Sequence, residues 1–209
     1  MIIKAKHHFV IHPIFKLFSR VMIKHHFAQL KVIGNMEVSN NRSILLLSNH
    51  CSWWDGFWQL NLNVKVFKKK FHFMMLEEQL KKHWYFNYTG GFSVKKSTRS
   101  TVETIQYSAE LLSHSENLVL MFPQGKVESI HKQSFIFEKG VEKILERVDR
   151  SKVQIVFLAN SIDYFINMKP ILHHYITEYK GVDINNFALQ ESYNAFYKDC
   201  IQQQTDKQV

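Results

Sequence analysis

The sequence contains few of the residues that interrupt folded structure. Among its 209 residues there are only 3 prolines and 7 glycines, which leaves little room for a flexible linker. No change in composition and no internal repeat marks a boundary between two large domains. Because 45% of the residues are hydrophobic, the chain is long and apolar enough to bury one core. We expect one folded domain, residues 29–209, preceded by a distinct N-terminal segment, residues 1–28.

Cysteine and long hydrophobic runs are also scarce. The two cysteines, Cys51 and Cys200, do not have the spacing of a zinc site, a redox motif or a disulfide framework, so we expect no metal and a reducing compartment. No run approaches the ~20 apolar residues that span a bilayer. Basic residues interrupt the apolar N-terminus and no small-residue cleavage site follows, so we expect no secretory signal.

Acidic residues are outnumbered by basic ones. The chain has 27 Lys and Arg against 18 Asp and Glu, a formal net charge of +9 at neutral pH. This balance predicts an anionic partner, such as lipid head groups, an acidic carrier protein, a phosphorylated substrate or nucleic acid. Because the sequence has no aromatic-basic RNA motif, zinc spacing or helix-turn-helix pattern, we do not expect nucleic acid to be the partner.

The N-terminal segment, residues 1–28, has the pattern of a basic amphipathic helix. Its apolar residues recur at spacings of three and four, and Pro13 favours a helix that begins there. They alternate with Lys4, Lys16, Arg20 and Lys24. Such a helix can lie in the surface of an anionic membrane, or it can pack against the core of its own domain. The sequence leaves both interpretations open.

Further along the chain, apolar runs alternate with amphipathic segments. We predict strands at 44–47, 71–76, 92–94, 117–122, 153–159 and 175–179. We predict helices that begin near 52 and cover 77–85, 100–113, 138–148 and 185–203. This alternation indicates an α/β fold: a single domain with a largely parallel or mixed central sheet flanked by helices.

The first predicted strand leads directly into a histidine and a carboxylate. His50 follows the strand, and Asp55 lies five residues later, where Ser52 and Asp55 form the pattern of a capping box at a helix start. Ligands collect at this edge of an α/β sheet. A histidine there can accept a proton near neutral pH, and a carboxylate can orient it. The alternative is that the two residues are only surface and capping groups.

Three further features follow the histidine motif in order. They are a glycine-basic block, residues 90–96, the sequence Phe122-Pro123-Gln124-Gly125, and the apolar segment 153–159. Together with Asn49-His50 and Asp55, this order resembles the four motifs of the glycerolipid acyltransferases, the lysophosphatidic-acid type. The resemblance covers residues 43–160, and the first motif matches completely.

The resemblance implies transfer of an acyl group from acyl-CoA or an acyl-carrier protein to a lipid hydroxyl. It makes His50 the general base and Asp55 the residue that orients it, with no covalent enzyme intermediate and no bound cofactor. It also implies a peripheral enzyme on the cytoplasmic face of the membrane. The residues that it assigns to substrate binding are Asn49, Gly91, Lys95, Lys96, Arg99, Phe122, Pro123, Gln124 and Gly125.

The sequence departs from the family pattern at three positions. Gln124 stands in place of the usual Glu, Lys95-Lys96 in place of an acidic-basic pair, and Phe157 where proline is common. These departures affect the prediction of lysophosphatidate as the acceptor more than the prediction of acyl transfer. Two other functions stay open: a basic lipid- or nucleic-acid-binding module without catalysis, and a thioesterase. A nucleophilic thiol at Cys51 is disfavoured because adjacent residues on an extended chain point apart.

Overall fold

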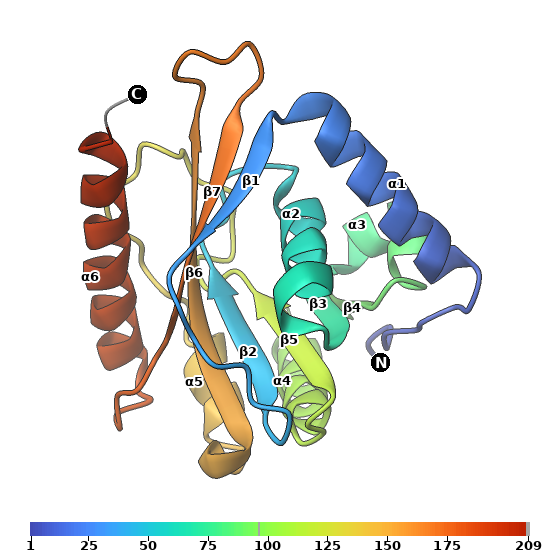
Figure 1. The fold of residues 1–209 in the computed structure, drawn as a ribbon. Coiled ribbons are helices and arrows are strands. Elements are labelled where there is room, and N and C mark those ends of the chain that lie inside the picture. The colour runs from blue at the N-terminus through green and yellow to red at the C-terminus, as the bar shows by residue number, and fades with distance from the viewer. Residues whose placement is uncertain (96, 208–209) are drawn as a thin grey trace.

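The computed structural model describes residues 1–95 and 97–207 (Figure 1). The helices are α1 (Ile11–His26), α2 (Asp55–Leu62), α3 (Glu77–Lys82), α4 (Thr98–Leu112), α5 (Gly140–Leu145) and α6 (Asn186–Thr205). The strands are β1 (Gln29–Ile33), β2 (Ser43–Ser48), β3 (Lys70–Leu76), β4 (Gly91–Val94), β5 (Asn117–Met121), β6 (Val153–Asp163) and β7 (Ile171–Glu178).

The strands form one sheet in the order β1-β7-β6-β2-β5-β3-β4. Five of them, from β6 to β4, are parallel, and β7 is antiparallel to β6. β1 pairs in parallel with β7 and therefore also runs against the other five strands. The predicted α/β fold with a mixed central sheet is confirmed.

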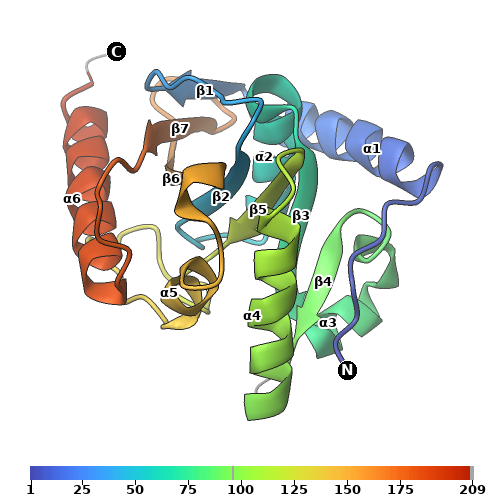
Figure 2. The same ribbon diagram turned by 90° about the horizontal axis from the view of Figure 1, so that it is seen from below.

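Helices cover both faces of the sheet (Figure 2). In the central strand β2, Leu45 and Leu47 belong to the core under α4, α5 and α6, whereas Ile44 and Leu46 face the core under α2. All six residues of β2 are buried. A strand buried on both faces has no polar side, which explains why the sequence shows a continuous apolar run there.

Some boundaries differ from the predictions. β1 was not predicted, because this short edge strand is largely exposed and its sequence, residues 29–33, lacks an apolar run. β7 begins at Ile171 instead of 175, and β6 continues to Asp163, because the two strands pair along this whole length. The segment predicted as a helix at 77–85 divides into α3 and a 3₁₀ turn, residues 84–86, and α5 is shorter than predicted.

Helix α1 packs on the domain with one face and exposes a second apolar face. The packed face carries Phe15, Ser19 and Ile23, which lie four residues apart; Phe15 contacts Phe57, and Asn61 of α2 donates a hydrogen bond to Ser19. The exposed stripe consists of Ile14, Leu17, Phe18 and Val21. Core packing accounts for the first face only. Among the described residues, no helix has the length and apolar character that crossing a bilayer requires.

Among the histidines buried in the sheet, His72 and His174 are neutral rings that bond to asparagine side chains. Burial lowers the pKa of His72 to about 3 and that of His174 to about 3. His72 donates from Nε2 to Asn117, and His174 donates from Nδ1 to Asn160. The unfolded chain takes up protons on these side chains near pH 6.5, whereas the folded chain does not. Their contribution to stability is therefore complete above about pH 6.5 and is lost as the pH falls toward 3.

We predict that the free energy of unfolding falls steeply below pH 6.5. Between about pH 7.5 and 5, His174 alone should account for about 2 kcal/mol, because the unfolded state binds one more proton. Replacing His174 by Asn, which keeps a donor near Nδ1, should make the dependence shallower in denaturant unfolding curves. The same curves for His131→Gln, at an exposed histidine, should keep the original slope. Equal slopes for His174→Asn and the parent protein would contradict this assignment.

Candidate active site

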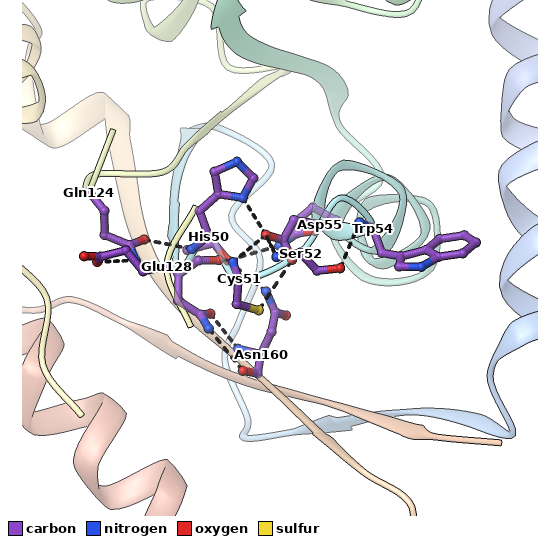
Figure 3. A network of polar contacts seen from close by, with 11 residues as sticks. His50, Cys51, Ser52, Trp54, Asp55, Gln124, Glu128 and Asn160 are labelled. Carbon is purple, nitrogen blue, oxygen red and sulfur yellow. Dashed lines mark hydrogen bonds and ion pairs between the residues drawn. The ribbon is translucent and has the colours of Figure 1, made fainter. Parts of the chain in front are cut away.

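His50 and Asp55 form a close pair at the carboxyl end of β2 (Figure 3). Their contact joins His50 Nδ1 to Asp55 Oδ2 at 2.6 Å, and the side chain of Asp55 is completely buried while that of His50 is 26% exposed. Because a carboxylate only accepts, Nδ1 must carry the proton. The neutral ring then presents the lone pair of Nε2, on its opposite side, to a substrate.

The turn between β2 and α2 fixes the Asp55 carboxylate. Asp55 Oδ2 also accepts hydrogen bonds from the backbone N–H groups of Cys51 at 2.8 Å and Ser52 at 3.0 Å. The Ser52 hydroxyl in turn accepts from the backbone of Trp54. Only half of the predicted capping box is formed: Asp55 accepts from the backbone of Ser52, but the Ser52 hydroxyl does not accept from the backbone of Asp55, and α2 begins at Asp55 with Trp54 as its N-cap residue. One carboxylate oxygen therefore both holds the turn ahead of α2 and orients the histidine.

Residues of the third motif hold His50 from the other side. β5 lies beside β2, so the chain that leaves β5 reaches the same edge of the sheet. The Phe122 ring stacks on the His50 imidazole with centroids 4.1 Å apart, and Gln124 Oε1 accepts from the His50 backbone N–H at 2.8 Å. Gly125 closes the turn with a φ of +67°, a conformation that favours glycine. Pro123 is buried, and its carbonyl accepts from the backbone of Glu138.

Glu128 completes this arrangement, and the sequence analysis missed it. Its backbone N–H donates to the His50 carbonyl at 2.8 Å, and its carboxylate accepts from Gln124 Nε2 at 3.1 Å. The ammonium groups of Lys132 and Lys126 lie 2.6 and 3.5 Å from the same carboxylate. These partners lower the pKa of Glu128, the Lys132 hydrogen bond most strongly. The only sequence signal was a carboxylate four residues after Gln124, which is too common to indicate a contact.

Asn49 has a supporting place in the fold and is not exposed to a substrate. Its side chain is 1% exposed, and its amide exchanges two hydrogen bonds with the backbone of Asn160 on β6. Asn160 is itself bonded to Ser48 and His174. This differs from the substrate contact expected for Asn49, because both of its polar atoms are already used within the protein. Asn49 instead fixes the backbone from which His50 projects.

The residues of the second motif lie apart from this cluster. Gly91 is buried where β4 begins, and β5 and β3 separate β4 from β2. Lys95 pairs with Glu77 at 3.1 Å, and the 90% exposed Arg99 pairs with Glu103 at 3.4 Å. Within residues 1–95 and 97–207, no hydrogen bond or ion pair joins Lys95 or Arg99 to His50 or Gln124. Lys96 lies outside the described residues.

The thiol of Cys51 is poorly suited to be a nucleophile. Its sulfur lies 3.7 Å from Asp55 Oδ1, and burial, together with the negative charge of Asp55, raises the pKa of the thiol. A thiol attacks as the thiolate, which this environment disfavours. The geometry thus agrees with the expectation that Cys51 is not a nucleophile.

One surface cavity lies away from this cluster. It has a volume of about 610 Å³ and is lined by residues 35–42 together with Thr177, Glu178 and Lys180. These residues lie at the opposite end of β2 and β6 from His50. His50, whose side chain is 26% exposed, instead reaches the surface at the other end of these strands.

The comparisons with known proteins identify the family. The model of the family described as Acyltransferase matches residues 29–159. This match covers well over half of the chain, so the protein belongs to this acyltransferase family, and the resemblance drawn from the sequence motifs is confirmed.

Solved structures share the fold, one of them over almost the whole of this chain. That structure is the 1-acyl-sn-glycerophosphate (LPA) acyltransferase PlsC from Thermotoga maritima, with a TM-score of 0.58 and 17% sequence identity over 94% of this chain and 80% of that chain. At this identity the similarity establishes the fold alone. No curated protein sequence matches the chain.

The contact between Gln124 and Glu128 gives a direct test of this geometry. We predict that Gln124→Glu destabilises the protein and lowers its activity, because two carboxylates would meet where an amide now donates. Adding Glu128→Gln restores a donor opposite an acceptor, so the double variant should recover about 1 kcal/mol of stability. Thermal melts of the two single variants and the double variant form a mutant cycle. If the effects of the two substitutions on stability are additive, the contact between Gln124 and Glu128 does not stabilise the protein, which would contradict this prediction.

Proposed function

We propose that this protein is an O-acyltransferase that moves a fatty acyl group from an acyl thioester to a lipid hydroxyl. The observation that carries the proposal is the contact of 2.6 Å between His50 and a fully buried Asp55 in a chain of the acyltransferase family. The donor is acyl-CoA or an acyl-carrier protein. The acceptor is a lipid such as a lysophospholipid, which places the reaction in phospholipid biosynthesis.

In the proposed reaction, His50 Nε2 removes the proton from the acceptor hydroxyl as the oxygen attacks the thioester carbonyl. The tetrahedral intermediate then collapses, and the departing sulfur takes the proton from the imidazolium. Asp55 stabilises the imidazolium and keeps the ring in place. Since an alcohol is a weak nucleophile until it loses its proton, a general base of this kind contributes roughly 10²–10⁴-fold in rate.

The charges around the site suit an anionic substrate. Lys95 and Arg99 are exposed at the edge of the sheet to which β2 also leads, and Lys126 and Lys132 lie beside Glu128. We assign these cations to the phosphate of the acceptor or to the phosphates of the donor. Gln124 is neutral and buried, and both ends of its amide are bonded, so we assign it to positioning His50.

We further propose that α1 holds the enzyme on the cytoplasmic face of an anionic membrane. Its exposed apolar stripe runs beside a row of cations spaced four residues apart, Lys16, Arg20 and Lys24. This combination suits a helix that lies in a lipid surface. A peripheral location would bring a lipid acceptor to the site without extraction into water.

Replacement of His50 tests the mechanism. We predict that His50→Ala lowers acyl transfer at least roughly 10²-fold and leaves the protein folded with a lower melting temperature, because Asp55 keeps its two backbone hydrogen bonds but loses the one from His50. Cys51→Ala is the matched control and should retain most activity. The assay uses a labelled acyl thioester with a lipid extract and separates acylated lipid from free fatty acid. Release of free fatty acid alone would identify a thioesterase, and normal turnover by His50→Ala would refute the mechanism.

Point substitutions on α1 test the membrane proposal without removing the helix. Leu17→Ser with Val21→Ser changes exposed side chains only, so the protein should remain folded while its binding to anionic vesicles falls. Raised salt should also weaken binding of the parent protein, because each basic residue near such a surface contributes about 1 kcal/mol that salt screens. Vesicle co-sedimentation at low and high salt measures both effects. Unchanged binding of the Ser variant would refute the membrane proposal and show that α1 serves only to pack against the domain.

A further inference from the structure

The connection between β6 and β7, residues 164–170, exposes an unusual number of large apolar side chains. Ile166 is 86% exposed and Met168 is 99% exposed. Tyr164 and Phe165 beside them are 57% and 38% exposed. Four large apolar residues within five positions of one exposed turn form a contiguous patch, and patches of this kind mark surfaces that contact another molecule.

The backbone of this hairpin tip holds the patch in a defined turn. The backbone N–H of Asn167 donates to the Tyr164 carbonyl at 2.8 Å. Phe165 has a φ of +47°, in the left-handed region that an aromatic residue rarely adopts. Such a conformation costs on the order of 1 kcal/mol or more. The turn at the tip therefore includes a backbone conformation at Phe165 that an aromatic residue does not favour.

The hairpin tip lies at the active-site end of the sheet. It extends β6 beyond Asn160, the residue that is bonded to Asn49 next to His50. At its base, the carbonyl of Pro170 accepts a hydrogen bond of 2.9 Å from the backbone of Ala28, two residues after α1 ends. Figure 1 shows the tip projecting next to the C-terminal end of α1. The exposed stripe of α1 and the hairpin tip thus belong to the same end of the molecule.

The N-terminal region that contains α1 and the region of the hairpin tip contain basic residues and no acidic ones. Residues 1–36 contain no Asp or Glu and six Lys or Arg, and residues 164–177 contain no Asp or Glu and one Lys, Lys169. Elsewhere the chain has 18 acidic residues. Lys4 pairs with Glu110, and Asp163 lies at the base of the tip. The tip and the helix beside it therefore combine exposed apolar side chains with a local excess of positive charge, which is complementary to an anionic bilayer.

We propose that the hairpin tip, residues 164–170, inserts into an anionic membrane as a second anchor beside α1. The proposal rests on the proposed function of a lipid acyltransferase. A projecting tip of Ile166 and Met168 suits a fluid bilayer, whereas a protein partner would need a groove shaped to receive it. Two linked contacts bind more tightly than either alone, and two separated contacts also fix the orientation of the protein. The edge of the sheet that bears His50 is then held at the lipid surface.

Polar substitution at the tip tests this anchor. Ile166→Ser with Met168→Ser should weaken binding of the full chain to vesicles of phosphatidylcholine and phosphatidylglycerol about tenfold or more. The matched control is Val182→Ser with Phe187→Ser, at side chains 93% and 72% exposed, in the segment that follows the end of β7 opposite the tip. The control should bind like the parent protein, and all three proteins should melt at similar temperatures because these side chains contact little of the core.

A label at the tip tests insertion independently of binding strength. An environment-sensitive fluorophore on Met168→Cys should shift to the blue with anionic vesicles, whereas the same label on Val182→Cys should not. The native thiols interfere little, because burial raises the pKa of Cys51 and raises that of Cys200 to about 12. A label at Met168 that does not respond while the protein is bound to vesicles would overturn the proposal.

Activity assays separate this proposal from the proposed function. The tip variant should lose transfer to a long-chain acceptor in vesicles and keep transfer to a short-chain acceptor in solution. Loss of both activities in a folded tip variant would point to a contact with the acyl donor, such as an acidic carrier protein, and would refute the membrane anchor. Absence of transfer by the parent protein with either acceptor would refute the proposed function, while the vesicle and fluorescence results would still decide the anchor.

Discussion

The buried carboxylate of Asp55 is the group on which the candidate active site depends. Removing a carboxylate from water is costly unless hydrogen bonds replace its hydration. Asp55 Oδ2 receives three such bonds, from two backbone N–H groups and from His50. The same bonds that offset the cost of burial also hold the turn between β2 and α2 and fix the tautomer of the histidine. Fold and proposed chemistry are therefore coupled at one oxygen atom.

The second support of the site comes from strands that are distant in sequence and adjacent in the sheet. β5 delivers Phe122 and Gln124 to the ring and the backbone of His50, and β6 delivers Asn160 to Asn49. These contacts hold the His50 backbone from both neighbouring strands, so its ring has little freedom except at its exposed side. Such rigid support suits a general base, since proton transfer requires the reacting atoms to be held within hydrogen-bonding distance.

The sequence predicted the central elements because their signals are local. The apolar run of β2 and the turn from Ser52 to Asp55 depend only on neighbouring residues. β2 lies where predicted, whereas α2 begins at Asp55 instead of near 52, because the Ser52 hydroxyl accepts from Trp54 and does not cap the helix. β1 was missed because its pairing with β7 depends on a distant strand, and its own residues are mostly exposed. For the same reason the motifs indicated His50 and Asp55, whereas Glu128 became visible only when the turn after β5 folded back onto the His50 carbonyl. The structure also shows that α1 packs on the domain with one apolar face and exposes another, two faces that interleave in the sequence.

The most direct test of the account is the protonation of the His50 ring, measured by nitrogen NMR on protein labelled at histidine. At a pH where the ring is neutral, the contact with Asp55 requires the proton on Nδ1 and an unprotonated Nε2. The account predicts this tautomer in the parent protein and a mixture of tautomers in Asp55→Ala. A parent protein in which Nε2 carries the proton would contradict it, because the nitrogen that faces the substrate could not then act as a base.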